Sequence, residues 1–282
     1  MVGGRPSGRP SFFGPPMILP LEAVTTLIRD AAQRFALPLF AAPTGVREKA
    51  PGDVVTAADE AIEQFLSDQL VRLLPGSAVV GEELAAKDPE WAGALAGEAP
   101  VWIIDPIDGT MNFSRGIPLF TIMVALATRG ETVGAWIYDP IHDLFGVAEK
   151  GAGTTINGRP ARASKRNNLK SMSGGFHLKF AAPAMAASLA ARAAEVGTVF
   201  EPRGAGQEYL YLADGRIDFT FFHRLLPWDH APGLLLHEEA GGYAARLTDG
   251  SRYRVDDDPW RGPLLAAPDR DTWRVLRDTL LR

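Results

Sequence analysis

Two short apolar runs that end in acidic residues constrain the fold of this 282-residue chain most strongly. Residues 78–80 lead through Gly81 into Glu82 and Glu83, and residues 101–104 lead directly into Asp105. Short apolar runs of this kind are typical of buried strands, and here each would deliver an acidic side chain to a cleft. We therefore expect a sheet whose strand ends carry the chemistry.

Helical and extended patterns alternate along the rest of the chain. Residues 21–40 carry apolar side chains at helical spacing, and Thr56 is placed to cap a second helix that runs toward Leu74. Strands are expected at 120–128, 132–138 and 144–149, as antiparallel neighbours joined by Gly, Asp and Pro turns. Beyond residue 166 we expect strands at 171–177, 198–200, 217–222 and 264–267 and helices at 183–195, 207–213, 229–240 and 270–281. The pattern predicts an α/β fold.

The best subdomain boundary lies in the polar connection that begins near Gly151. It divides the chain into an N-terminal α+β subdomain at 17–150 and a C-terminal α/β subdomain at 151–282. Residues 1–16 are rich in Gly and Pro and lack the apolar segment of a secretion signal, so we expect a flexible tail. Either a dispensable extension or a start codon assigned too early would explain this tail.

Charge and composition exclude several classes of function. The formal net charge of -5 argues against a protein that binds nucleic acid through a broad basic face. The absence of cysteine excludes disulfides, thiolate nucleophiles and cysteine-based zinc sites, and it makes the cytoplasm the default compartment. No apolar run reaches the roughly 18 residues that a membrane helix needs, so membrane insertion is not expected.

The segment WIIDPIDGTMNF, residues 102–113, is the strongest indication of chemistry. Pro106 lacks an amide hydrogen and turns the chain, so that Asp105, the carbonyl of Ile107 and Asp108 face one point. Carboxylate and carbonyl oxygens favour hard cations such as Mg²⁺. The segment thus predicts a metal site, although Asp, Pro, Gly and Thr also form ordinary turns.

The next two residues predict a phosphate site beside that metal site. A helix or turn that begins at Gly109 and Thr110 would direct free backbone N–H groups toward an anion, and glycine permits a close approach. Magnesium ions in turn bind phosphate oxygens readily.

A further acidic residue, Asp229 in PWDHAPG, begins a predicted helix after a strand-rich segment. A carboxylate at this position also stabilises a helix N-terminus, so a simple cap is the alternative interpretation. The segments GEE, DPIDGT and WDHAPG nevertheless occur in order, each beside an apolar run. This order favours one shared cleft.

These segments, together with DVVTAADEAIE at residues 53–63, resemble the inositol monophosphatase family of lithium-sensitive, magnesium-dependent phosphatases. The resemblance extends from about Met17 to the end of the chain. It implies a layered αβαβα fold of the sugar-phosphatase type, with two sheets and flanking helices, in a homodimer. It also implies hydrolysis of a phosphate monoester with two or three Mg²⁺ ions.

The resemblance assigns metal ligands residue by residue, with Asp105 bridging two ions. Glu83 is at most a support for these ligands. The implied ligands are Glu82, Asp105, the carbonyl of Ile107, Asp108 and Asp229.

The resemblance also implies catalytic and phosphate-binding roles. Thr110 would orient the nucleophilic water with the support of Asp59, and Glu82 would act with them. The backbone N–H groups of Gly109 and Thr110 would hold the phosphate, and Lys49 is similar to the family's cationic residue on a mobile loop.

The chain departs from the family in the predicted substrate pocket. Phe222 stands seven residues before Asp229, where inositol phosphatases have a glutamate that contacts substrate hydroxyls. An aromatic ring cannot accept those hydrogen bonds, so we do not expect myo-inositol 1-phosphate to be the best substrate. His223 and Arg224 are expected to line the pocket instead, although His223 also suits an ordinary strand or loop. The guanidinium of Arg224 suits a carboxylate or a second phosphate.

Three polar sites near these motifs have plainer interpretations. Gln207 and Glu208 either meet the substrate or begin a solvated helix. His230 is expected to pack or to bond the backbone rather than to bind metal. The acidic run at 256–258 lacks regular ligand spacing, so we expect a solvated turn.

We therefore predict a magnesium-dependent phosphatase for a small phosphorylated metabolite, with no nucleic-acid or membrane partner. Histidinol phosphate, fructose 1,6-bisphosphate and a 3'-phosphonucleotide remain alternative substrates. A catalytically silent module that binds phosphorylated ligands or a protein is the alternative of another class. The complete ligand set with Thr110 and Asp59 favours an enzyme, because binding alone needs no positioned water.

Overall fold

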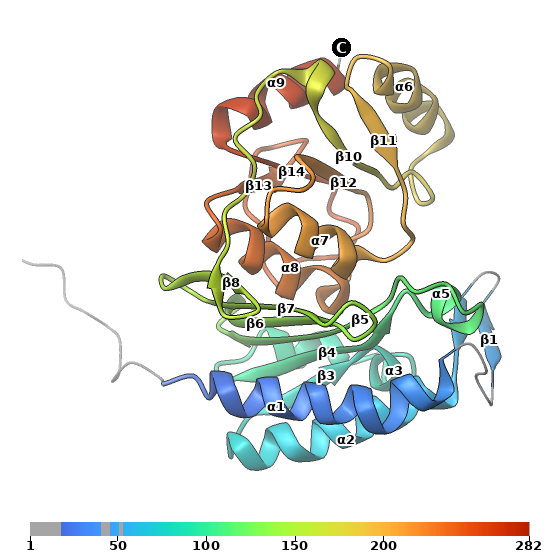
Figure 1. Ribbon diagram of the computed structural model, residues 1–282, viewed down its shortest axis with the longest axis vertical. Coiled ribbons are helices and arrows are strands. Elements are labelled where there is room, and N and C mark those ends of the chain that lie inside the picture. The colour runs from blue at the N-terminus through green and yellow to red at the C-terminus, as the bar shows by residue number, and fades with distance from the viewer. Residues whose placement is uncertain (1–17, 41–45, 51–52, 282) are drawn as a thin grey trace, which may run out of the picture.

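Layers of helices and sheets alternate through the protein (Figure 1). From the bottom of the view they are helices α1 and α2, a seven-stranded sheet, helices α7 and α8, a five-stranded sheet, and helices α6 and α9. This arrangement confirms the predicted αβαβα fold. The computed structural model describes residues 18–40, 46–50 and 53–281, with the backbone alone for 49, 50, 53 and 54. The tail predicted at 1–16 lies outside the described residues.

The first layer consists of the two predicted N-terminal helices. Helix α1 (Leu21–Ala31) continues through a π turn and a 3-10 turn to Leu39. Helix α2 (Ala57–Leu73) begins at the predicted cap, because the Thr56 hydroxyl accepts a hydrogen bond from the Ala58 amide at 3.2 Å. The Thr56 amide donates in return to Asp59 Oδ2 at 2.9 Å. This reciprocal capping box holds Asp59 in a fixed position.

The seven-stranded sheet has the order β3-β4-β5-β6-β7-β8-β9. Strands β3 and β4 are parallel, and every later pair is antiparallel. The subdomain boundary at 150 stays a prediction, and β8 and β9, which follow it, pair within this first sheet. The strands are β3 (Ala78–Gly81), β4 (Val101–Asp108), β5 (Thr121–Thr128), β6 (Glu131–Asp139), β7 (Leu144–Glu149), β8 (Gly153–Ile156) and β9 (Arg159–Pro160).

Three short helices and a small hairpin accompany this sheet. The helices are α3 (Glu82–Ala85), α4 (Trp91–Leu95) and α5 (Thr110–Ser114), and the hairpin pairs β1 (Arg47–Ala50) with β2 (Asp53–Val55). Figure 1 shows α5 beside this hairpin at one end of the sheet.

The five-stranded sheet has the order β11-β10-β12-β14-β13. Strand β13 had no clear signal in the sequence. The strands are β10 (Ser173–Phe176), β11 (Thr198–Phe200), β12 (Phe219–Phe222), β13 (Tyr243–Arg246) and β14 (Leu264–Ala267). The helices around it are α6 (Pro183–Ala193), α7 (Ala205–Ala213), α8 (Pro227–Glu239) and α9 (Arg270–Leu281). Within the described ranges, none of the helices is both long and apolar enough to span a membrane.

Apolar cores fill the spaces between the layers. Leu66 of α2 and Trp136 of β6 belong to the lowest core. Leu210 of α7 and Leu264 of β14 belong to the core between the sheets, and Leu276 of α9 belongs to the outermost one. Helices α7 and α8 are therefore covered on both sides, which fixes their N-terminal ends relative to both sheets.

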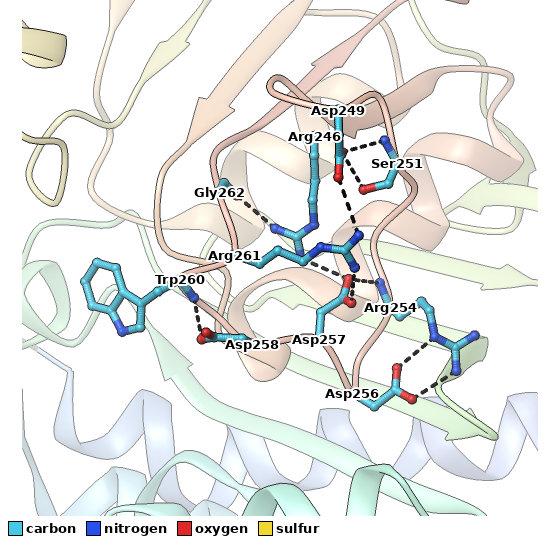
Figure 2. A network of polar contacts seen from close by, with 10 residues as sticks. All are labelled: Arg246, Asp249, Ser251, Arg254, Asp256, Asp257, Asp258, Trp260, Arg261 and Gly262. Carbon is cyan, nitrogen blue, oxygen red and sulfur yellow. Dashed lines mark hydrogen bonds and ion pairs between the residues drawn. The ribbon is translucent and has the colours of Figure 1, made fainter.

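An arginine–aspartate network occupies the turn at residues 256–258 (Figure 2). Asp257 accepts hydrogen bonds from Arg246 Nη2 at 2.9 Å and from Arg261 Nη1 at 2.7 Å, and Arg246 is completely buried. Asp256 instead pairs with the partly exposed Arg254. The segment is a turn, as expected, but the solvated interpretation is wrong for Asp257, because its carboxylate neutralises a buried guanidinium.

Replacing Asp257 with alanine should destabilise the protein by about 3 kcal/mol, because the buried charge of Arg246 would lose its partner. The neighbouring Asp256→Ala is the matched control and should cost about 1 kcal/mol or less, since its ion pair is partly exposed. Urea denaturation of both variants measures the difference. Equal effects would contradict the buried pair as the main support of this turn.

Candidate active site

A β-bulge in β4 turns the side chains of the DPIDGT segment toward one side. Asp105 pairs with Met123 of β5, and Asp108 pairs with Thr121, so three steps on β4 match two on β5. In a regular strand, residues three apart point to opposite faces. The extra residue, beside Pro106, places Asp105 and Asp108 opposite partners that share a face. The local turn that the sequence predicts is therefore present as a bulge.

Asp108 joins the two halves of the chain. Its Oδ1 accepts a hydrogen bond from the Ala205 amide at 3.0 Å, and its Oδ2 accepts one from the Gly206 amide at 2.8 Å. The Thr121 hydroxyl also donates to Oδ2 at 3.2 Å. The carboxylate thus caps the N-terminus of α7, where the dipole favours negative charge. A side chain at Gly204 would lie 3.2 Å from Asp108 Oδ2, which explains the small residue there.

Thr110 and Asp59 are brought together as the sequence predicts. The Thr110 hydroxyl lies 2.9 Å from the carbonyl oxygen of Ile107 and 3.4 Å from Asp59 Oδ1. Gly109, with a φ of 91°, precedes Thr110 at the start of α5. Its positive φ is easily adopted only by glycine. Burial raises the pKa of Asp59 to about 7, although the hydrogen bonds from Thr56 oppose this shift.

Glu63 is a site residue that the sequence argument missed. Its Oε2 and Oε1 accept hydrogen bonds from the amides of Glu83 and Leu84, each at 2.8 Å, and so hold the first turn of α3. A Cβ at Gly81 would lie 2.2 Å from Glu63 Oε2, so glycine is required for this approach. Helix α3 begins with Glu82, and Glu63 therefore sets the position of that predicted ligand. The available signal was the last residue of DEAIE, which is Glu63 itself.

Four acidic residues form a carboxylate cluster, defined as Glu82, Asp105, Asp108 and Asp229. Asp105 is 1% exposed, and its Oδ1 has no hydrogen-bond partner among the described residues. Burial, followed by repulsion from the other three members and from Asp59, raises the pKa of Asp105 well above its usual value. Burial, with repulsion from Glu82 and Asp108, raises the pKa of Asp229 to about 8. The cluster is therefore strained by its own charge.

The cluster fits a divalent cation by its chemistry. Its donors are all oxygens, one buried oxygen lacks a partner, and a cation would offset the repulsion. No group of three or more acidic or histidine side chains in the described residues is already arranged to hold a metal ion. Binding would therefore have to draw the carboxylates closer together. The ligand roles stay a prediction.

A cavity of about 770 Å³ opens beside Asp108 and Asp229. It is lined by the residues that the sequence assigns to phosphate or substrate, which are Gly109, Thr110, Phe222, His223 and Arg224. A pocket of this size suits a small-molecule ligand. Lys49 lies in β1, but its side chain is outside the described part of the chain.

Phe222 is packed into the pocket wall rather than free in the cavity. It is 4% exposed, and its ring stacks on His177 with centroids 4.5 Å apart. His177 Nε2 lies 2.5 Å from Glu208 Oε1, and Glu208 is completely buried. The solvated-helix interpretation of Gln207 and Glu208 is therefore wrong. Glu208 instead contacts His177, which lines the pocket. The sequence did not identify His177 as a pocket residue.

His230 bonds the backbone, as expected. Its Nε2 lies 3.0 Å from the carbonyl oxygen of Arg224, and its Nδ1 lies 3.0 Å from the Tyr209 hydroxyl. Burial lowers the pKa of His230 to about 3, so the ring is neutral near pH 7. A neutral ring that donates from Nε2 and accepts at Nδ1 satisfies both contacts.

Comparison with known proteins supports the resemblance noted in the sequence. The model of the inositol monophosphatase family matches residues 21–276. An inositol-1-monophosphatase of Mesorhizobium japonicum is 34% identical over 220 residues, which are 74% of this chain and 77% of that protein. The Nus factor SuhB of Escherichia coli is 32% identical over 214 residues, with coverage of 74% and 77%.

Solved structures share the fold. An IMPase from Thermotoga maritima superposes with a TM-score of 0.79 at 24% sequence identity, over 93% of this chain and 96% of that one. Identity at this level supports the common fold alone.

Protonation of the carboxylate cluster predicts how stability depends on pH. Asp229, with a folded pKa of about 8 against 3.8 in an unfolded chain, binds more protons when folded between those values. In EDTA, the free energy of unfolding should therefore fall as pH rises from 6.5 to 8.5, and Asp229→Asn should show a shallower fall. Thermal unfolding at several pH values measures both. A variant as steep as the native protein would contradict the assignment.

Glu63→Gln should weaken magnesium binding about tenfold, because an amide cannot accept both backbone hydrogen bonds that hold α3. Glu60→Gln, on the exposed side of the same helix, is the control and should bind magnesium as the native protein does. Isothermal titration with MgCl₂ measures the affinities, and circular dichroism checks the fold. Unchanged affinity in Glu63→Gln would show that Glu82 needs no such support.

Proposed function

Because the chain belongs to the inositol monophosphatase family, we propose that it hydrolyses a small phosphate monoester with magnesium ions held at the carboxylate cluster. That it is a phosphatase follows from the family. The identity of the metal, the number of bound ions and the class of substrate are our proposal. The observation that carries it is the placement of Thr110 and Asp59 beside a set of acidic residues that repel one another.

Thr110 is suited to orient an attacking water. Its hydroxyl hydrogen has two acceptors in reach, the Ile107 carbonyl at 2.9 Å and Asp59 at 3.4 Å. The lone pairs of the hydroxyl oxygen are then available to accept a hydrogen bond from water. Asp59, with its pKa raised to about 7 by burial, is a proton acceptor matched to neutral pH.

The metal ions would be held by Glu82, Asp105, Asp108, Asp229 and the carbonyl of Ile107. When bound, divalent cations lower the pKa of a coordinated water and neutralise the charge that develops on the phosphoryl and leaving oxygens. The amides of Gly109 and Thr110, at the start of α5, would donate to the phosphoryl group. Phosphoryl transfer depends mainly on such positioning and charge stabilisation, so no covalent intermediate on the protein is needed.

Relatives named Nus factor SuhB raise the alternative of a protein-binding role. A binding module would need neither Thr110 nor Asp59 beside the cluster, and this arrangement favours catalysis. We also propose a cytoplasmic homodimer that acts on a small phosphorylated metabolite. The lack of cysteine is compatible with a reducing compartment, and light scattering on the purified protein tests the dimer.

Asp105→Asn should reduce phosphate release from a generic monoester by roughly 10³-fold or more, because it removes the most central charge of the cluster. Asp143→Asn, an exposed position with an ordinary surface ion pair, is the matched control and should retain native activity. Phosphate release is measured with MgCl₂ and with EDTA, and circular dichroism confirms folding. Activity that persists in excess EDTA would refute the metal mechanism.

A further inference from the structure

The cavity beside the carboxylate cluster carries more positive charge than one phosphate group requires. Four permanently cationic side chains line it, and its acidic side chains are Asp108, Asp229 and Glu201. The first two belong to the cluster, whose charge the proposed metal ions would offset. The four cationic residues are Arg115, Lys179, Arg203 and Arg224.

None of these four side chains forms a salt bridge with the other described residues. Arg224 and Lys179 contact the ring of Phe180, and Arg224 also interacts electrostatically with Asp229. The guanidinium carbon of Arg224 lies 4.2 Å from the ring centroid, and Lys179 Nζ lies 5.2 Å from it. Glu201, the remaining carboxylate, lies 3.8 Å from His177 Nδ1. An anion that enters the cavity therefore meets unpaired positive charge.

The backbone at Arg224 is held in place by two hydrogen bonds. Its carbonyl oxygen is 3.0 Å from His230 Nε2, and the following amide, of Leu225, donates to the carbonyl of Pro259 at 2.9 Å. Its guanidinium is also close enough to Asp229 to favour the charged form of that carboxylate. Arg224 thus interacts both with Asp229 of the cluster and with the ring of Phe180.

His177 and the buried Glu208 form a pair in the same wall. Burial of the ring opposes protonation, but the charge of Glu208 and its hydrogen bond outweigh burial and raise the pKa of His177. Phe222 stacks on this ring and presents no hydrogen-bond acceptor to the cavity. Phe222 therefore offers no acceptor to the hydroxyl groups of a neutral polyol, whereas the cationic side chains suit an anion.

We propose that the substrate carries a second anionic group, a carboxylate or another phosphate, which Arg224 binds while the first phosphate lies at the carboxylate cluster. This inference rests on the proposed phosphatase function. A guanidinium donates to both kinds of anion through two parallel hydrogen bonds, which makes Arg224 the anchor. Lys179 supplies supporting charge.

Matched pairs of substrates test the proposal, each pair differing in the second anion. The pairs are glycerol 1-phosphate with 3-phosphoglycerate, fructose 6-phosphate with fructose 1,6-bisphosphate, and 3'-AMP with adenosine 3',5'-bisphosphate, and myo-inositol 1-phosphate serves as a neutral polyol ester. In at least one pair, kcat/KM should be tenfold or more higher for the second-anion compound, mainly through a lower KM. The pair that responds distinguishes a carboxylate from a phosphate.

Variants assign the preference to residues. Arg224→Gln should reduce the ratio of kcat/KM within the responding pair by about tenfold or more, and Arg224→Lys should retain part of it. Lys179→Gln, at an exposed position, should reduce the ratio less. Arg274→Gln, on the exposed face of α9, is the matched control and should leave the ratio unchanged.

Two results would overturn the inference while the proposed function stands. The first is hydrolysis of both members of every pair with similar kcat/KM, or a preference for myo-inositol 1-phosphate over all of them. The second is a preference that survives in both Arg224 variants. If no monoester is hydrolysed with MgCl₂, the proposed function fails and this inference fails with it.

Discussion

The mutual repulsion of buried carboxylates is the constraint on which the site depends. Asp105 is enclosed by three other acidic residues and keeps one oxygen without a partner. Such a group is costly to bury as an anion unless a cation or a proton offsets it. The cluster thus lowers the stability of the protein at one point of its core, and binding of the proposed cations would restore it. Proteins commonly place destabilising charge where function requires it.

Residues from several layers of the fold meet at the carboxylate cluster. Asp108 accepts the first amides of α7, so a strand of the lower sheet is tied to a helix that packs under the upper sheet. Asp229 lies in the first turn of α8, and the apolar core between the two sheets covers this helix. Chain segments on both sides of the predicted subdomain boundary therefore reach one site, and neither half could form it alone.

The substrate pocket differs from the carboxylate cluster in the sign of its charge. There the unpaired charge is positive, and Phe222, packed between His177 and His230, stands where a hydroxyl-binding glutamate would be. Glu208, buried within the protein, holds His177 in this wall through a contact of 2.5 Å. Change at a few pocket positions alters the preferred substrate while the hydrolytic centre remains the same, which is how one fold serves several phosphate esters.

Local sequence determined much of this protein. The Thr56 cap, the ends of β7, β14 and α9, and the turn at Pro106 follow from neighbouring residues, because capping, periodicity and proline geometry are local effects. The support of α3 by Glu63, the burial of Glu208 against His177 and the gathering of four cations around one cavity required the tertiary structure. These contacts join residues that lie far apart in the chain, and no local pattern specifies which distant partner a buried polar group will find.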